Sequence, residues 1–236
     1  SSYSYNEVFT KTLTNERATK SNILNARTFV ENANENDVVV VFIAGHGMLD
    51  DKFDYYFGTH DIDFLNPAEN GLSYNDLEKI LYACKARKKL LFMDTCHSGE
   101  VDKDELMVEE EVETETGAIA FRSAQAVTYE DAFGLENTLR LSQELFSDLR
   151  SGTGATVISA AGGTEYALEG LDSKNGLFTN SILNALDNLN ADKDKNNEIS
   201  VKELYEYVSN RVSYLSNGAQ APMQRAENLR IDYRIF

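Results

Sequence analysis

Several residue types are scarce in this chain of 236 residues, and each scarcity excludes a class of protein. Tryptophan is absent and proline occurs only twice, so the chain has neither a proline-rich linker nor a proline-rich low-complexity tail. No apolar run approaches the ~20 residues that a membrane-spanning helix requires. The first residues, SSYSYNEVF, lack the basic-then-apolar order of a secretory signal peptide. We therefore expect a cytoplasmic protein that does not enter a membrane.

Cysteine is also scarce, with only Cys84 and Cys96. A secreted protein of this size more often carries several pairs, so the count favours a reducing compartment and free thiols. Cys84 falls on a predicted helix and Cys96 follows a buried strand. This arrangement disfavours a disulfide between them.

Basic residues are fewer than acidic ones: the chain has 22 Lys and Arg and 39 Asp and Glu, and its formal net charge is −17. Such a surface repels nucleic acid and anionic membranes and attracts cationic partners. We therefore expect no nucleic-acid partner. Taken by itself, however, the charge is sufficiently explained by solubility.

The apolar residues gather in three continuous runs, at 38–44, 90–93 and 155–161. Continuous runs of this length are typical of strands that are covered on both faces, as in parallel α/β sheets. Helical patterns lie between the runs, and the second begins with the capping pair Ser73 and Asp76. The residues expected to face inward are Ile23, Ala26, Val30 and Ala33, then Leu77, Ile80, Leu81 and Cys84, then Leu177, Ile182, Leu183, Leu186 and Leu189. This alternation predicts a single α/β domain over 1–236 with a mostly parallel sheet.

One segment interrupts this pattern. Residues 100–116, EVDKDELMVEEEVETET, are acidic and poor in apolar side chains, and the residues up to about 139 are weakly patterned. We expect 100–139 to form a mobile surface insert within the domain.

Two chemically reactive side chains follow the first two predicted strands. His46 comes directly after the run at 38–44 within AGHG, and Cys96 follows 90–93 within DTCHSGE. Ligands of parallel α/β sheets bind beyond the carboxyl ends of the strands. A histidine beside a thiol can convert it to the nucleophilic thiolate, and the N–H groups of Gly47 and Cys96 can stabilise an oxyanion. A buried structural cysteine and a strand-terminating histidine are the alternative. Their occurrence at matching strand ends, each near glycine, favours catalysis.

These two motifs resemble those of the caspase and metacaspase clan, peptidase family C14, in which histidine precedes cysteine by about 50 residues. The resemblance extends through 37–39, 158–161 and 175–179, and it is strongest to bacterial caspase-like proteases with the DTCHSG form. It implies a caspase-like fold of three layers, with a central sheet flanked by helices. It also implies a cysteine endopeptidase that requires no cofactor.

The resemblance also implies residue roles. Cys96 is expected to be the nucleophile and His46 its general acid and base, whereas His97 is expected to be structural. Asp94 corresponds to the acidic residue that lines the S1 pocket and favours Arg or Lys at P1, the substrate residue before the cut. For Asp94, acceptance of backbone N–H bonds at the strand end is the alternative. Ser159 and Ala160 resemble the strand segment that pairs with the substrate backbone.

The chain departs from the family in two places. The family opens with a strand and a helix ahead of the region at 5–33, so the sheet either lacks its first strand or is completed by another segment. The acidic stretch after Gly99 occupies the position of the family's intersubunit linker. If activation requires a cut there, Lys103 and Arg122 are the basic sites to test first.

A second motif, at 192–203, matches the calcium loop of EF-hands. Oxygen-bearing side chains occupy loop positions 1, 3, 5, 9 and 12. Position 6, which is usually glycine, holds Asn197, and asparagine is one of the few other residues that tolerate the left-handed conformation required there. The ligand positions hold Asp192, Asp194, Asn196, Ser200 and Glu203. A capping box formed by Ser200 and Glu203 is the alternative, since it starts a helix without any metal.

Three functions are therefore compared. The first is a cysteine endopeptidase acting after Arg or Lys, with possible self-cleavage at 100–125. The second is an inactive scaffold with the same fold, which the presence of both His46 and Cys96 disfavours. The third is a calcium-responsive regulatory domain, which rests only on 192–203.

Overall fold

A central four-stranded sheet organises the protein. The computed structural model describes residues 5–50, 54–95, 111–114, 117–121, 154–160, 168–170, 175–226 and 232–236. The strand order is β1-β5-β8-β10, in which β1, β5 and β8 are parallel and β10 is antiparallel to β8. Their bounds are β1 (Val38–Gly45), β5 (Lys88–Thr95), β8 (Ala155–Ser159) and β10 (Met223–Arg225). The predicted α/β fold with a mostly parallel sheet is confirmed.

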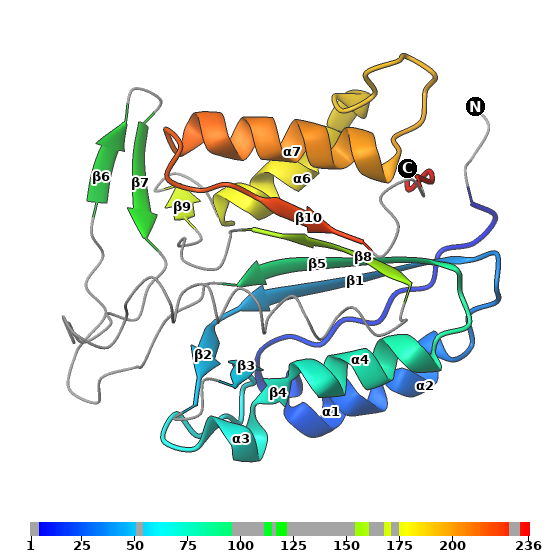
Figure 1. Ribbon diagram of the computed structural model, residues 1–236, viewed down its shortest axis with the longest axis vertical. Coiled ribbons are helices and arrows are strands. Elements are labelled where there is room, and N and C mark those ends of the chain that lie inside the picture. Colours follow the sequence, from blue (N-terminus) through cyan, green and yellow to red (C-terminus); the bar gives the residue numbers. More distant parts are fainter. Residues whose placement is uncertain are drawn as a thin grey trace.

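Helices cover the two faces of this sheet and give three layers (Figure 1). One face carries α6 (Leu177–Leu186) and α7 (Val201–Leu215), and the other carries α1 (Lys20–Asn25), α2 (Arg27–Val30) and α4 (Tyr74–Ala83). Successive side chains of β5 point to opposite faces of the sheet, as in any β-strand. Leu90 and Phe92 belong to the core under α6 and α7, whereas Leu91 and Met93 belong to the core over α4. The apolar run at 90–93 is therefore buried on both faces, as predicted.

Helix α4 follows the sequence pattern closely. The Ser73 hydroxyl accepts a hydrogen bond from the Asp76 backbone N–H at 3.2 Å, which caps the first turn. Leu77, Ile80 and Leu81 are buried on its inner face. Cys84 is buried directly after the helix and its thiol is free, as predicted.

The other two predicted helices differ from the pattern. The region before β1 forms a single 3-10 turn, η1 (Asn15–Arg17), and then the two short helices α1 and α2. Helix α6 ends at Leu186, where the 3-10 turn η3 (Asp187–Leu189) contains Asn188 at φ 50°. The prediction that Leu183 faces inward is wrong, because it is 53% exposed. It follows Ile182 by one residue, a rotation of about 100°, which carries it off the buried stripe.

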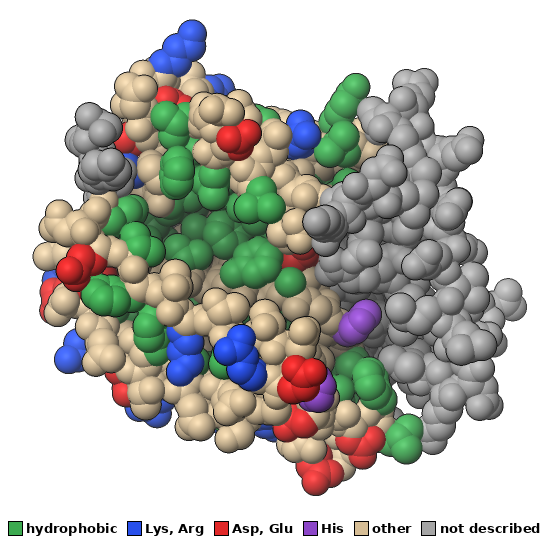
Figure 2. Space-filling view, turned by 180° about the vertical axis from the view of Figure 1, so that it is seen from behind, with side chains coloured by type: hydrophobic (Ala, Val, Ile, Leu, Met, Phe, Trp, Pro, Cys, Tyr) green, Lys and Arg blue, Asp and Glu red, His purple; other side chains and the backbone are tan. Residues whose placement is uncertain are grey.

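Strand β1 is an edge of the central sheet, and within the described residues no strand lies beyond it. Its side chains on the α6 side are only partly covered, since Val40 is 52% and Phe42 46% exposed. Seen from behind, the molecule has a hollow in which hydrophobic side chains are exposed (Figure 2). The prediction that the run at 38–44 is covered on both faces is therefore wrong for the side of β1 that carries Val40 and Phe42.

Two smaller sheets and a short helix complete the described structure. Their elements are β2 (Gly47–Leu49), β3 (Tyr55–Phe57), α3 (Pro67–Asn70) and β4 (Leu72–Ser73), then β6 (Glu111–Thr114), β7 (Gly117–Phe121) and β9 (Leu168–Gly170). Antiparallel pairing of β6 with β7 shows that part of the predicted 100–139 insert forms strands. Partner strands satisfy the backbone there, which local composition does not reveal. The rest of the insert lies outside the described residues.

No helix within the described ranges combines the length and the apolar character needed to cross a lipid bilayer.

Candidate active site

The carboxyl ends of β1 and β5 lie side by side. In their parallel register, Ala44 is opposite Asp94 and Gly45 is opposite Thr95. His46 is the next residue after β1, and its side chain is exposed. Cys96 is the next residue after Thr95 in the chain and lies outside the described residues. The structure thus confirms the adjacency of the two strand ends that the sequence predicted.

The backbone at His46 is held by a glycine that the sequence reasoning missed. The N–H of Gly58 donates to the carbonyl of His46 at 2.8 Å, beside the pairing of β2 with β3. A Cβ atom on Gly58 would lie 3.2 Å from that carbonyl oxygen, a tighter contact than most side chains make. Glycine at 58 therefore lets the two backbones approach closely. The sequence signal that could have identified Gly58 is its position directly after the short aromatic segment 55–57. Gly47, the predicted oxyanion donor, is buried at the start of β2.

Asp94 lies in the interior at the end of β5, where it is only 1% exposed. Its Oδ2 accepts a hydrogen bond from the Thr179 hydroxyl in the first turn of α6, 85 residues further along the chain. A buried carboxylate requires such polar partners, because removing charge from water is costly. Thr179 is a second residue that the sequence reasoning missed.

Buried aromatic residues pack against the end of β5 on the α4 side of the sheet. The Tyr55 hydroxyl donates to Thr95 Oγ1 at 3.1 Å, and the Tyr74 hydroxyl donates to Met93 Sδ at 3.4 Å. These tyrosines and Phe57 have ring centroids 5.1–5.6 Å apart. Burial raises the pKa of Tyr74 well above its usual value, so its hydroxyl stays protonated and can donate. The residue that precedes Cys96 is therefore packed and hydrogen-bonded.

Ser159 and Ala160, predicted to pair with substrate, lie at the end of the interior strand β8. Ser159 is between Met93 on β5 and Met223 on β10. The Ala160 N–H donates to the Met93 carbonyl at 2.8 Å, and the Ala160 carbonyl accepts from the buried Gln220 side chain at 2.8 Å. Both backbone groups of Ala160 are thus engaged within the protein. Pairing with a substrate through this residue requires an exchange of these bonds.

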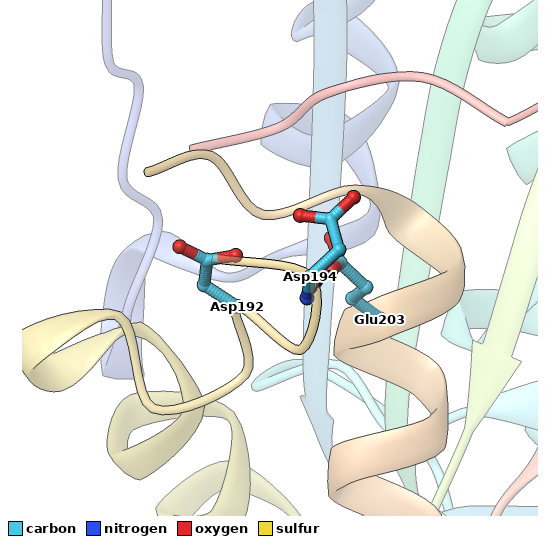
Figure 3. Close-up of side chains that lie close together, drawn as sticks. All are labelled: Asp192, Asp194 and Glu203. Atoms are coloured by element: carbon cyan, nitrogen blue, oxygen red, sulfur yellow. Dashed lines mark hydrogen bonds between the residues drawn. The ribbon is translucent and has the colours of Figure 1, made fainter. Parts of the chain in front are cut away.

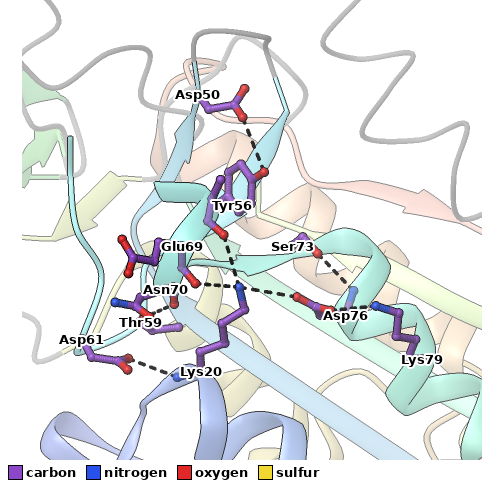
Figure 4. A network of polar contacts seen from close by, with 11 residues as sticks. Lys20, Asp50, Tyr56, Thr59, Asp61, Glu69, Asn70, Ser73, Asp76 and Lys79 are labelled. Atoms are coloured by element: carbon purple, nitrogen blue, oxygen red, sulfur yellow. Dashed lines mark hydrogen bonds and ion pairs between the residues drawn. The ribbon is translucent and has the colours of Figure 1, made fainter. Parts of the chain in front are cut away.

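A polar network fastens α1 beneath the small β2-β3-β4 sheet (Figure 4). The Lys20 ammonium donates to the carbonyl of Glu69 at 3.1 Å, and its backbone N–H donates to Asp61 at 3.1 Å. The Lys79 ammonium lies 3.0 Å from Asp76. Burial acts to raise the pKa of Asp76, but hydrogen bonds from Lys79 and Ser73 outweigh it and the pKa is lowered. These contacts stabilise the layer that supports the backbone after His46.

The loop at 192–203 has the left-handed residue that the sequence predicted at its sixth position. Asn197 has φ 64°, in the left-handed region predicted for loop position 6. The Asp192 carboxylate accepts hydrogen bonds from the N–H groups of Asn196 at 3.1 Å and Asn197 at 2.8 Å. The C-terminal residues pair with the loop, since the Ile199 N–H donates to the Phe236 carbonyl at 2.8 Å.

Three carboxylates converge at this loop (Figure 3). One oxygen each of Asp192, Asp194 and Glu203 lies within 4.8 Å of the others. Glu203 also completes the capping box with Ser200 at the start of α7, so the alternative interpretation of this pair is confirmed as a structural role. Desolvation acts to raise the pKa of Glu203, but backbone N–H donors outweigh it and the pKa is lowered. Glu203 is therefore ionised in the folded protein at neutral pH.

Four residues singled out from the sequence lie outside the described residues. They are Cys96, His97, Lys103 and Arg122. The described part of the candidate site therefore consists of His46 and Gly47 after β1, Asp94 near the end of β5 with its partner Thr179, and Ser159 and Ala160 at the end of β8.

Comparison with known proteins gives a consistent assignment. The family profile of the Caspase domain, peptidase C14, matches residues 4–233. The crystal structure of protein GSU0716 from Geobacter sulfurreducens is similar, with a TM-score of 0.55 and 18% sequence identity over 91% of this chain and 76% of that chain. At this identity the likeness concerns the fold alone. A search of curated proteins finds no match.

Proposed function

Because this chain belongs to the caspase domain family of peptidase C14, we propose that it is a cysteine endopeptidase. The observation that carries the proposal is the parallel register of β1 and β5, which sets the ends of the two strands side by side. The two residues that follow these ends in the chain are His46 and Cys96. A thiol and an imidazole in this relation are the components of a cysteine protease dyad.

The proposed reaction uses the two residues in sequence. His46 takes the proton of the Cys96 thiol, and the thiolate attacks the scissile carbonyl carbon. The N–H groups of Gly47 and Cys96 stabilise the oxyanion that forms. His46 then gives its proton to the leaving amine, and water hydrolyses the thioester to release the acid product and the free thiol.

We propose a preference for Arg or Lys at P1, supported by Asp94. This carboxylate is at the end of β5, two residues before Cys96, and is shielded from solvent. A carboxylate in low-dielectric surroundings binds a guanidinium or ammonium group through strong charge-assisted hydrogen bonds. The net charge of −17 also favours the approach of cationic substrates.

A panel of fluorogenic peptides that differ only at P1 tests both proposals. Wild type should cleave peptides with Arg or Lys at P1 and leave the Asp peptide intact. Cys96→Ala and His46→Ala should each lose at least ~10³-fold in kcat/KM, as expected for loss of a nucleophile or its base. Cleavage of no peptide would favour an inactive scaffold, and cleavage after Asp alone would refute the role of Asp94.

We further propose self-cleavage in the 100–125 region, with Lys103 and Arg122 as the first candidates. These are basic residues in the region where the family carries a processed linker. Incubation of wild type should give two fragments, whereas Cys96→Ala should remain one chain. Lys103→Gln and Arg122→Gln, alone and together, identify the cut. A fully active wild type that stays intact contradicts this proposal.

An accessory calcium site at 192–203 is a separate proposal, favoured by the convergence of Asp192, Asp194 and Glu203. Carboxylate oxygens are the ligands that calcium prefers. Both oxygens of Glu203 accept backbone N–H bonds, so a bidentate contact to calcium requires these bonds to lengthen or exchange.

Calorimetry after removal of divalent ions tests this site. Calcium should release or absorb heat and raise the melting temperature of wild type, whereas Asp194→Ala should show neither effect. Lys195→Ala, at a loop position that supplies no side-chain ligand, is the matched control and should resemble wild type. Absence of any heat with wild type, together with an unchanged melting temperature, refutes the site.

A further inference from the structure

Thr179 stands out because its hydroxyl reaches a buried carboxylate that the catalytic dyad does not use. It is the third residue of α6, and its Oγ1–H donates to Asp94 Oδ2 (the helix begins at Leu177 after the cap residue Gly176). The cap has no side chain and makes no side-chain capping bond. The Thr179 hydroxyl is thus an ordered donor at the start of the helix, and it is directed at the end of β5.

This contact has a directional consequence for Asp94. A carboxylate has two oxygens with about four acceptor positions, and a donor fixed on Oδ2 defines the rotation of the whole group. The pair links β5 in the sheet layer to α6 in the helix layer. Ordering the carboxylate before the substrate binds lowers the entropic cost of forming a salt bridge with it.

We infer that Thr179 is a positioning residue for substrate specificity, which orients Asp94 to receive a cationic P1 side chain. This inference rests on the proposed function. The Thr179 hydroxyl acts on Asp94, the proposed P1-binding group, so we assign its contribution to substrate binding rather than to the chemical step. Its removal should therefore raise KM for Arg peptides and leave kcat nearly unchanged.

The test compares two peptides with Arg or citrulline at P1, since citrulline has nearly the same shape as Arg but carries a neutral urea group in place of the guanidinium. Wild type should prefer Arg. Thr179→Val keeps the shape and lacks the hydroxyl, and it should raise KM for the Arg peptide by about ten- to hundredfold, the range for losing a hydrogen bond to a charged group. The citrulline peptide should be affected less than twofold. Thr179→Ser, which keeps the hydroxyl, should recover most of the preference.

Asn180→Ala is the matched control, which tests whether any perturbation of the first turn of α6 lowers the preference for Arg. The Asn180 side chain also lies in the first turn of α6, where it donates to the Asn175 carbonyl at 2.7 Å. It should leave the preference for Arg unchanged. Equal losses with Arg and citrulline, or a Thr179→Val enzyme identical to wild type, overturn the inference while peptide cleavage stands. If wild type cuts neither peptide, the proposed function fails and the role of Thr179 fails with it.

Discussion

At the scale of single residues, the support of the candidate site depends on buried hydroxyl groups. The Tyr55 hydroxyl donates to Thr95 Oγ1, and both side chains are buried. Tyr55→Phe removes this bond and leaves a buried acceptor. We expect a loss of about 1 kcal/mol in the free energy of unfolding, measured in urea, and a lower kcat because Thr95 directly precedes Cys96.

Tyr74→Phe is the control for this prediction. Tyr74 belongs to the same aromatic cluster, but its hydroxyl donates to the sulfur of Met93, a weak acceptor. Its loss should cost less stability and leave kcat close to wild type. Equal effects of the two substitutions would show that general packing, and not the Thr95 contact, is responsible.

The pH dependence of stability should depend in part on Asp76. Burial acts to raise its pKa, but the bonds from Lys79 and Ser73 hold the pKa below the ordinary 3.8. Since the folded pKa is lower than the unfolded one, the carboxylate stabilises the fold above pH ~4, and this stabilisation is lost as the pH falls through the folded value.

Asp76→Asn tests this linkage by urea unfolding at several pH values. We expect a loss of up to about 1 kcal/mol at neutral pH, because the carboxylate is only partly buried and solvent weakens its ion pair, and a smaller fall in stability between about pH 5 and 3 than in wild type. Glu7→Gln, at an exposed position, is the control and should follow wild type. A pH profile of Asp76→Asn parallel to wild type would falsify the assignment.

The sequence predicts the candidate site only where chemistry follows strand ends. His46, Gly47 and Asp94 were found because a continuous apolar run indicates a strand, and parallel α/β sheets bind ligands beyond the carboxyl ends of their strands. Thr179 and Gly58 were missed because their partners are distant in the chain. Such contacts depend on how layers pack, and no local periodicity encodes them.

At the scale of elements, β1 combines two properties that promote association. Among the strands that the structure describes, β1 pairs with β5 alone and so forms a sheet edge, and Val40 and Phe42 are about half exposed. Exposed apolar edges are templates for pairing with another chain. We expect Val40→Lys to lower concentration-dependent association, measured by sedimentation velocity, with little change in the free energy of unfolding.

The control for this prediction is Tyr82→Lys. Tyr82 is 51% exposed on α4, where the helix satisfies its own backbone. The Tyr82→Lys substitution removes a similar exposed apolar surface without altering a strand edge, so it should leave association unchanged. If both variants reduce association equally, general hydrophobicity and not the open edge is the cause.

The elements themselves were predictable to different degrees. Strands β1 and β5 and helix α4 follow from their runs and caps, because these local signals agree with the tertiary packing. The break between α6 and η3 and the exposure of Leu183 could not be predicted, since an amphipathic pattern does not define the width of the buried face. The pairing of β6 with β7 was missed because a strand is stabilised by its partner strands, which the local sequence does not reveal.

At the scale of the whole molecule, one strand joins the two halves of the core. Leu90 contributes to the cluster with Phe178 and Val208, and Leu91 to the cluster with Leu77 and Leu81. Both β5 leucines are fully buried. The two clusters share the backbone of β5, so disruption of either should destabilise the other. This arrangement supports the prediction that 1–236 unfolds as a single domain.

Leu90→Ala and Leu91→Ala test this cooperativity from opposite faces of the sheet. Each should lower the free energy of unfolding by about 2–5 kcal/mol, the usual cost of a cavity at a buried leucine. For each variant, urea curves from far-ultraviolet circular dichroism and from tyrosine near-ultraviolet signals should coincide and keep the wild-type slope. The tyrosine signal is suited to this purpose because the chain has no tryptophan. A variant whose two curves separate would show that the layers on either side of β5 unfold independently, and the single-domain prediction would then be wrong.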